Sequence, residues 1–465
     1  MARPEAEVTA QAATVRIWDV AVVGGGVVGC AVARRFALEG AAVVLLERAP
    51  DILAGASKGN SALLHTGFDA PPDSVELACM QAGYHEYLEI RERLGLPLME
   101  TGAAVVAWNE DDLVRLDAIL AQAHRNGVTD VRRIDRAELM QREPNLAAHA
   151  KGAVLVPGEH VIDPWSAPLA YLTQALAHGA AVWRNAPVTG GDFDGVTWHL
   201  ATPRGPVSAR QVINCAGLQG DVLEHELLGS SDFEIRPRKG QFVVFDKAAA
   251  KLLTTIILPV PTERTKGVVL CRTIFGNLLV GPTAEEQPDR ERAATDSATL
   301  AQLRDQAIRM LPGLADIPVT AIYAGLRPAS ERKEYRIAAK PGRHWITVGG
   351  IRSTGLTGAL GIARHVWSLY AEQGYRHTPP EVGHWPRMPN LAEHEMRDWQ
   401  QPGYGEIVCH CEMVTRREIE AALTGPLAAG DRHGLKRRTR AGMGRCQGFY
   451  CTARVAALCE GRLHE

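Results

Sequence analysis

Residues 18–47, WDVAVVGGGVVGCAVARRFALEGAAVVLLE, decide the fold of the N-terminal part of the chain. The apolar run 18–23 has the composition of a strand, and a Gly-rich turn follows at 24–29. A stretch with helical spacing comes next, and then a second apolar run that ends at Glu47. This order predicts a strand–turn–helix–strand unit, the start of a parallel sheet of the dinucleotide-binding type.

Gly24, Gly26 and Gly29 form the pattern G-x-G-x-x-G between the predicted strand and helix. The first glycine permits the tight turn, the second lets the backbone approach a pyrophosphate, and the third allows close helix–strand packing. A carboxylate at Glu47 accepts hydrogen bonds from ribose hydroxyls and repels a 2′-phosphate. The sequence therefore predicts a dinucleotide site that disfavours NADP.

Length and composition exclude several classes of protein. The chain has 465 residues, 46% of them hydrophobic and 22% charged, which predicts several folded domains rather than disorder. The formal net charge of −2 gives no reason to expect a nucleic-acid partner. We find no apolar run long enough to span a bilayer and no secretory signal in the polar tail, residues 1–16, so we expect a cytoplasmic protein.

The rest of the chain predicts an α/β plus α+β protein. Helical spacing over 76–149 predicts a helical insertion, and short strand-like runs over 231–339 predict an antiparallel substrate domain. The proline-rich stretch 377–405 predicts a linker before a small domain at 406–465. The predicted Rossmann-like nucleotide-binding domain is discontinuous and comprises residues 17–75, 150–230 and 340–376.

The nine cysteines are unevenly distributed, which points to a reducing compartment and a special role for the C-terminal ones. Cys409 and Cys411 are spaced C-x-C, and Cys446 and Cys451 are spaced C-x(4)-C. Four thiolates can hold a 2Fe–2S cluster or a zinc ion, and C-x-C is unusual for structural zinc. The spacing alone leaves a cluster, a zinc ion and an empty site open.

The stretch from Gly24 to Arg48 and the segment GASKGNSALLHTG at 55–67 resemble the D-amino-acid-oxidase/glycerol-3-phosphate-dehydrogenase class of flavoproteins. Asn214–Gly217 and Gly349–Thr357 resemble two further FAD-binding turns of that class. The resemblance implies FAD as the dinucleotide. The FAD contacts that it implies are Gly24, Gly26, Gly29, Glu47, Arg48, Ser57, Asn60, Ser61, Val188, Gly217, Gly350, Thr354, Gly355, Leu356 and Thr357.

Two groups within this class are most similar. The segment from His65 to about residue 190 resembles L-2-hydroxyglutarate dehydrogenases, and GLRPAS at 325–330 resembles the catalytic subunit of anaerobic glycerol-3-phosphate dehydrogenase. The C-terminal segment resembles the bacterioferritin-associated-ferredoxin-like domain. That resemblance implies a 2Fe–2S cluster on Cys409, Cys411, Cys446 and Cys451. We expect the basic run 436–440 to offset the charge of this cluster.

The resemblance implies two catalytic residues. Arg327 in GLRPAS corresponds to an arginine that grips the anionic substrate, and a guanidinium suits carboxylate and phosphate alike. His65 lies where the chain passes the flavin and could be a general base, a flavin contact or a structural residue. His160 and Asp163 are expected to be turn residues.

Two departures leave the nature of the substrate anion open. Ile351 stands where the glycerol-3-phosphate enzymes have a lysine, and Gly67-Phe68-Asp69 replaces a segment that contains an arginine. Both weaken the case for phosphate. Arg332, Arg336 and Arg352 are weaker candidates for binding the anion.

The function that follows is an FAD-dependent dehydrogenase of a small anionic secondary alcohol, either glycerol 3-phosphate or a 2-hydroxy acid. Electrons would leave through the cluster to a second flavoprotein subunit or a quinone-linked acceptor, in a hetero-oligomer that could lie at the inner membrane through its partner. The alternatives are an amine or imino-acid dehydrogenase of the opine, hydroxyproline or D-amino-acid type, and a non-catalytic electron-transfer subunit.

Overall fold

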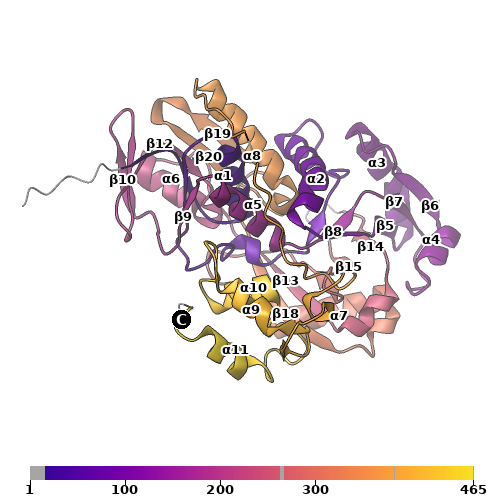
Figure 1. Cartoon of the computed structure of the whole chain (residues 1–465). Helices are drawn as coiled ribbons and strands as arrows, with labels where there is room; N and C mark the ends of the chain where they lie inside the picture. Colours follow the sequence, from indigo (N-terminus) through magenta and orange to yellow (C-terminus); the bar gives the residue numbers. More distant parts are fainter. Residues whose placement is uncertain (1–15, 262–266, 382, 464–465) are drawn as a thin grey trace, which may run out of the picture.

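The computed structural model describes residues 16–261, 267–381 and 383–463. Most of the predicted tail, residues 1–15, lies outside this range. Two large sheets organise the described chain, and a small C-terminal domain contacts segments of both (Figure 1). No helix in the described ranges is both long and apolar enough to cross a membrane.

The first sheet has eight strands around a parallel core in the order β9-β2-β1-β12, with β20 also parallel to β12. Val20, Val22 and Leu45 are fully buried because helices cover this sheet, as is usual for parallel strands. Helices α1 and α5 pack together, and α8 packs on α1 and α2. The strands are β1 (Ile17–Val23), β2 (Val43–Leu46), β9 (Ala181–Trp183), β10 (Gly190–Phe193), β11 (Trp198–Ala201), β12 (Val207–Asn214), β19 (Arg336–Lys340) and β20 (Trp345–Gly349).

The carboxyl ends of these parallel strands meet at one edge. Val23 pairs with Leu46 on one side and with Asn214 on the other. The segments that leave this edge are the Gly-rich turn, the loop after Glu47, the turn at 215–217 and the turn at 350–354. In an open α/β sheet this edge is where ligands bind.

The second sheet has nine strands and is mostly antiparallel. Its order is β17-β13-β16-β15-β14-β5-β7-β6, with β18 on the other side of β13. The strands are β5 (Ala103–Ala107), β6 (Arg132–Asp135), β7 (Gly152–Val156), β13 (Arg238–Phe245), β14 (Ile256–Pro259), β15 (Val269–Arg272), β16 (Leu278–Gly281), β17 (Glu285–Glu286) and β18 (Val319–Arg327).

The predicted helical insertion at 76–149 is only partly helical. It contains helices, but β5 and β6 within it join the second sheet, where β5 pairs with β14 and β7. Strand β7, which was expected in the nucleotide-binding domain, also belongs to this sheet. These strands are stabilised by partners far away in the sequence, so local periodicity does not reveal them. The helices are α2 (Val75–Leu94), α3 (Glu110–Arg125) and α4 (Arg136–Arg142).

The remaining elements complete the layers. A three-stranded sheet contains β3 (Leu63–Leu64), β4 (Leu98–Glu100) and β8 (His160–Ile162). The helices outside the small domain are α1 (Val27–Leu38), α5 (Ser166–Ala177), α6 (Gly220–Leu228), α7 (Ser297–Met310) and α8 (Gly355–Glu372). The small domain contains β21 (Ile407–Cys409), β22 (Val414–Thr415), α9 (Arg416–Ala422), α10 (Arg432–Thr439) and α11 (Thr452–Cys459) around its own apolar core.

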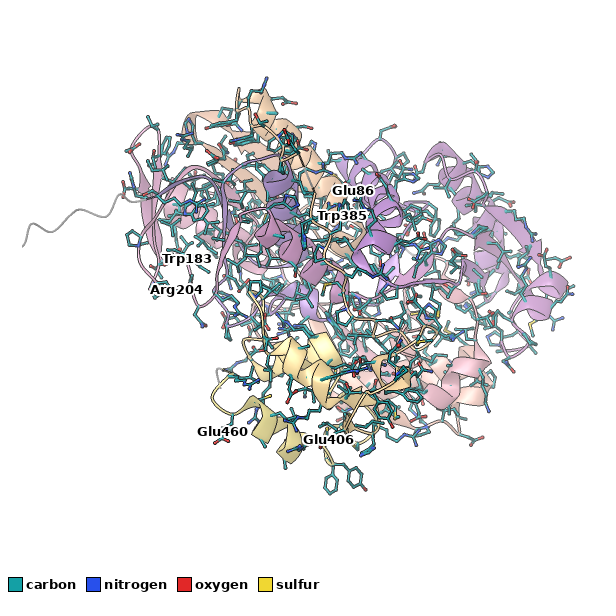
Figure 2. All side chains as sticks on the ribbon, in the orientation of Figure 1. Glu86, Trp183, Arg204, Trp385, Glu406 and Glu460 are labelled. Atoms are coloured by element: carbon teal, nitrogen blue, oxygen red, sulfur yellow. The ribbon has the colours of Figure 1, made fainter. Side chains whose placement is uncertain are left out.

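The predicted linker, 377–405, is packed against the rest of the molecule in its described part. Trp385 lies beside Glu86, and Arg34 contacts both side chains (Figure 2). Further along, Leu391 and Ala392 are buried in the core of the nine-stranded sheet. This segment therefore acts as a strap across the two sheets rather than as a loose tether.

The small domain is held by buried ionic contacts. Asp51, on the loop after β2, is fully buried and accepts two hydrogen bonds from Arg438, at 2.6 and 2.9 Å, and one from the amide of Gly430. Arg437 donates to the carbonyl of Ile52. These arginines belong to the basic run 436–440. They attach the domain, a role that we did not expect for this run, and the expectation that the run offsets the cluster's charge stays a prediction.

Candidate functional site

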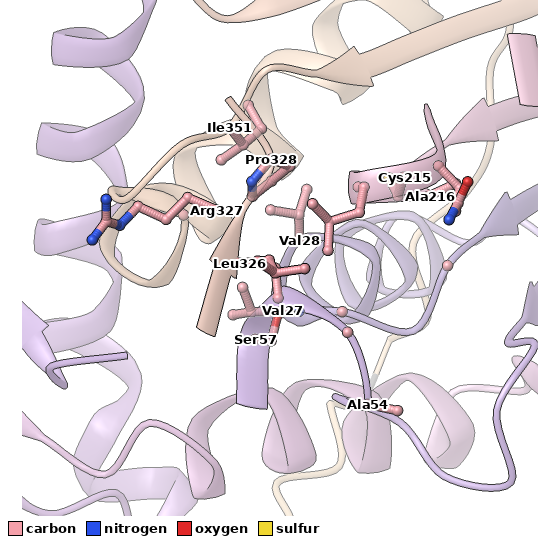
Figure 3. A pocket seen from close by; sticks show the side chains of 18 of the residues that line it. Val27, Val28, Ala54, Ser57, Cys215, Ala216, Leu326, Arg327, Pro328 and Ile351 are labelled. Atoms are coloured by element: carbon pink, nitrogen blue, oxygen red, sulfur yellow. Dashed lines mark hydrogen bonds between the residues drawn. The ribbon is translucent and has the colours of Figure 1, made fainter. Parts of the chain in front are cut away.

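A cavity of about 480 Å³ opens at the carboxyl edge of the parallel strands. Val27 and Val28 of α1 form one wall, and Cys215 and Ala216 lie close by (Figure 3). Leu326 and the end of β18 close it from the nine-stranded sheet. The cavity therefore lies between the two sheets, at the site that the Gly-rich turn predicts.

The three glycines of the turn have different roles. Gly24 has φ +110°, a conformation that L side chains rarely adopt, and a Cβ there would overlap the carbonyl oxygen of Cys215. A Cβ on Gly29 would overlap the carbonyl oxygen of Gly24. At Gly26 the nearest atom would be the hydroxyl of Ser57, at 3.2 Å. Gly24 and Gly29 are thus required by packing, whereas Gly26 leaves room for a ligand.

Glu47 is held at the cavity wall by the backbone. Its Oε2 accepts from the amide of Gly25 at 2.7 Å and its Oε1 from the amide of Ala49 at 2.8 Å. Burial raises the pKa of this carboxyl, while the same hydrogen bonds act in the opposite direction. Ser57 accepts from the amide of Val27, at the start of α1, so its hydroxyl marks the anion-binding end of that helix.

Most of the predicted FAD contacts line the cavity. Those that do so are Gly24, Gly26, Glu47, Arg48, Ser57, Asn60, Ser61, Val188, Gly217, Gly350, Gly355 and Leu356. Gly29, Thr354 and Thr357 do not. The hydroxyl of Thr354 donates to Glu76. The hydroxyl of Thr357 accepts from the amide of His65 and donates to the carbonyl of Leu63. Both threonines therefore hold the turn at 350–354 in place without lining the cavity.

Arg327 lines the cavity and has an unusual environment. Figure 3 shows its guanidinium at the opposite side of the view from Cys215 and Ala216. Burial and the nearby Arg238 cation lower the pKa of Arg327 to about 10. Its hydrogen bond goes to the carbonyl of Thr283 at 2.7 Å, and no carboxylate among the described residues pairs with it. A cation so placed favours an anionic ligand.

The weaker arginine candidates differ from Arg327. Arg352 also lines the cavity, but it forms an ion pair with the buried Glu76 at 3.0 Å. Arg336 pairs with Glu331 at 3.2 Å. Their charges are already compensated within the chain.

His65 lies beside a carboxylate that the sequence analysis did not single out. Its Nδ1 is 2.6 Å from Oε2 of Glu159, which is fully buried. Glu159 also accepts from the amide and hydroxyl of Thr66. Neither His65 nor Glu159 lines the cavity described above. Glu159 directly precedes His160, which is the first residue of β8 and not the turn residue that we expected. Glu159 pairs with His65 because β3 and β8 are neighbours.

The C-terminal thiols form two interacting pairs, Cys411 with Cys446 and Cys409 with Cys451, and no three metal-binding side chains in the described residues surround a single ion. Hydrogen bonds from the backbone amides of Tyr450, Gly448 and Phe449 lower the pKa of Cys446. Such amides stabilise a thiolate and the sulfurs of a cluster. A Cβ on Gly444 would overlap that of Cys411, so this loop needs glycine to close around the thiols. The donor set fits a 2Fe–2S cluster.

Comparison with known families assigns both regions. The family model described as FAD dependent oxidoreductase matches residues 19–369. The model described as BFD-like [2Fe-2S] binding domain matches residues 407–460.

Three curated relatives illustrate the range of similar proteins. A glycerol 3-phosphate dehydrogenase from Caloramator mitchellensis is 30% identical over 95% of this chain and 94% of its own length. One of the subunits of anaerobic glycerol-3-phosphate dehydrogenase from Escherichia coli K12 is 25% identical over 95% of this chain and 87% of its own. Mitochondrial L-2-hydroxyglutarate dehydrogenase from Caenorhabditis elegans is 28% identical over 57% of this chain and 63% of its own.

Among solved structures, L-alpha-glycerophosphate oxidase from Mycoplasma pneumoniae, with FAD bound, superimposes with a TM-score of 0.76 and 25% identity. It covers 81% of this chain and 100% of its own. Glycine oxidase from Geobacillus kaustophilus superimposes with a TM-score of 0.69 at 22% identity, over 79% of this chain and 100% of its own. The comparisons confirm the predicted flavoprotein fold, its FAD and the 2Fe–2S domain.

Proposed function

The chain belongs to the FAD-dependent oxidoreductase family, and from this premise we propose that it is a dehydrogenase of a small anionic secondary alcohol that passes electrons to a partner protein. The observation that carries the proposal is Arg327, a largely buried cation at the cavity wall with no acidic partner in the described chain. A substrate carboxylate or phosphate would supply that partner. A bidentate contact would also orient the substrate.

Glycerol 3-phosphate is the first candidate substrate. Its support is the relative named glycerol 3-phosphate dehydrogenase, which matches this chain over both domains. A 2-hydroxy acid is the second candidate, because Ile351 and Asp69 replace the basic residues expected for phosphate. The relative named L-2-hydroxyglutarate dehydrogenase matches 57% of this chain.

FAD, when bound, supplies the acceptor for the hydride of the substrate carbon. The protein must bind the anion, for which we assign Arg327, and must take the hydroxyl proton. For the proton we assign His65, which does not itself line the cavity but whose amide donates to Thr357, the residue after the cavity-lining Leu356. The contact between His65 Nδ1 and Glu159 orients the ring, and the buried carboxylate stabilises the imidazolium that forms when the ring accepts a proton. Glu159 is a positioning residue in this scheme.

The cluster gives the electrons a way out of the chain. Phe449 and Tyr450 stand between Cys446 and Cys451 and are 82% and 79% exposed. Exposed aromatic residues are enriched at protein interfaces, so we assign this loop to the electron-accepting partner. The Escherichia coli relative is by name one subunit of its enzyme, which supports a hetero-oligomer here. Such a partner would decide whether the enzyme lies at the inner membrane or in the cytoplasm.

The test is an anaerobic substrate screen of the FAD-loaded protein, with loss of the oxidised flavin's absorbance as the readout. We expect glycerol 3-phosphate or L-2-hydroxyglutarate to bleach the flavin, and Arg327→Ala to abolish this response at the same concentration. Arg236→Ala is the matched control, because Arg236 is an exposed arginine paired with Glu234. Bleaching by glycine, proline or an opine alone would contradict the proposal and favour the amine dehydrogenase.

A further inference from the structure

Two aromatic rings occupy the space between the cavity and the cluster-binding loop. Trp165 follows Pro164, which lines the cavity. Its ring stacks on that of Phe275, with centroids 5.6 Å apart and planes inclined by 15°. Trp165 packs against the cores of both sheets, so it stands at their junction.

On the far side, Phe275 contacts the C-terminal domain. The guanidinium carbon of Arg440 lies 4.0 Å from the centroid of the Phe275 ring. The Nε of Arg440 donates to Glu412 at 2.7 Å, and Glu412 directly follows the cluster ligand Cys411. A continuous series thus leads from Pro164 at the cavity wall through Trp165, Phe275 and Arg440 to Glu412, the residue after Cys411.

Two features of the series Trp165, Phe275 and Arg440 lower the stability of the folded chain, so stability does not explain them. The indole Nε1 of Trp165 is buried, and it has no hydrogen-bond partner in the described part of the chain. Arg440 is 5% exposed and has φ +67°, a left-handed conformation that is rare for residues other than glycine. A buried unpaired polar group and a strained buried cation both reduce stability, and such features cluster at functional sites.

The stacked rings of Phe242 and Tyr323, which also lie near the cavity, do not form such a series to the C-terminal domain. Phe242 lines the cavity and stacks on Tyr323, with centroids 4.6 Å apart. The hydroxyl of Tyr323, however, donates to the carbonyl of Asn60, back on the flavin side. The loop between Cys446 and Cys451 reaches this strand at the carbonyl of Thr320, which accepts from Gln447.

We propose that Trp165, Phe275 and Arg440 form the route by which electrons pass from the flavin site to the 2Fe–2S cluster. This inference rests on the proposed function, in which electrons leave the chain through the cluster. Each hydride brings two electrons to the flavin, and they leave singly. In each of the two steps the flavin would lose one electron and the cluster would gain one, and the single proton of the hydride would go to solvent over the pair of steps. The cluster is reoxidised by an external one-electron acceptor before the second step.

The experiment reduces the flavin with light and EDTA under anaerobic conditions, so that its outcome does not depend on the substrate. Flavin reduction is followed by absorbance, and cluster reduction by EPR on freeze-quenched samples. Phe275→Leu and Trp165→Leu remove a ring, whereas Phe275→Tyr and Trp165→Phe retain one. Phe245→Leu is the matched control, because Phe245 is fully buried in a different core.

We expect both ring-removing variants to reduce the cluster several-fold more slowly than the wild type, at unchanged flavin photoreduction and unchanged FAD and iron content. The ring-retaining variants and Phe245→Leu should keep the wild-type rate. Equal rates for ring-removing and ring-retaining variants would overturn the route, as would loss of either cofactor from both ring-removing variants, which would make the pair structural. The route would also be overturned if dithionite reduces the cluster of the wild-type protein whereas the photoreduced flavin does not.

Discussion

The flavin cavity and the cluster domain are built in different ways. The cavity is formed by backbone turns and small residues at the edge of a parallel sheet, and Gly24 and Gly29 are needed because neighbouring backbone leaves no space for a side chain. The cluster site depends on four side chains from two short loops, in a domain with a small core. The first site is therefore sensitive to added atoms and the second to removed ones, and the ion pair between Asp51 and Arg438 is one of the contacts that join the two regions.

The largest expected effect is at Gly29. A Cβ there overlaps the carbonyl of Gly24, so Gly29→Ala should yield protein without flavin and should lower the melting temperature of the apo-protein. Gly26→Ala is the control, since its Cβ faces the cavity. It should weaken FAD binding but leave the apo-protein's melting temperature unchanged. Equal melting temperatures for the two apo-variants would show that the packing argument is wrong.

The complementary change is at the cluster. Cys451→Ser removes a thiolate ligand, so iron and sulfide should be lost from the purified protein while FAD content stays near one per chain. Cys271→Ser is the control, because this buried cysteine lies in the core of the nine-stranded sheet. Metal analysis and the flavin spectrum of the same sample decide the outcome. Retention of iron in Cys451→Ser would remove this residue from the ligand set.

Asp51→Asn tests the ionic contact between the two regions. It leaves Arg438 buried without its carboxylate, and breaking such a pair costs about 3–5 kcal/mol. Denaturant unfolding, followed by loss of the cluster's visible absorbance, should report this decrease. Arg445→Ala should cost about 0–1 kcal/mol by comparison, since Arg445 is 68% exposed in its pair with Asp246. Similar losses for both variants would contradict the assignment of Asp51 as the main attachment.

Arg327→Ala should lower kcat/KM for the anionic substrate, because a largely buried ion contact is lost. The decrease should correspond to a loss of about 2–5 kcal/mol in the binding of the transition state. Steady-state kinetics with an artificial acceptor measure this, and Arg327→Lys should recover part of it. FAD content should be unchanged. A loss confined to flavin binding would mean that Arg327 serves the cofactor rather than the substrate.

The smallest expected effect on the chain itself is at Phe449 and Tyr450. Replacing both by alanine should change the free energy of unfolding by no more than about 0.5 kcal/mol, because both are exposed. Electron transfer to the native partner should nevertheless slow, while transfer to a small dye should not. Slowing with both acceptors would place the defect at the cluster instead of the interface.

Sequence reasoning succeeded where a local pattern sets the structure. Gly24, Gly26 and Glu47 predicted the cavity, and the cysteines together with the resemblance of their segment predicted the 2Fe–2S domain. It failed where partners are far apart in the sequence. Strand β5 is stabilised by β14 and β7, and no local signal reports that pairing.

The missed side-chain contacts have the same origin. Glu159 meets His65 only through the pairing of β3 with β8, and Asp51 meets Arg438 only when the small domain is in place. In both cases a charged residue in a loop has no distinguishing local pattern. For the contact between Asp51 and Arg438, the sequence offered one signal: an acidic residue shortly after Glu47 together with the distant basic run 436–440.

The attachment at Asp51 has a consequence for biosynthesis. Asp51 precedes its partner Arg438 by 387 residues, so the ribosome must complete the whole flavoprotein part before Arg438 can join Arg184 beside this carboxylate. A domain with so small a core depends on its metal group to fold. If the small domain folds only around its cluster, the loop after Glu47 gains its contact with Arg438 only once iron and sulfide are in place.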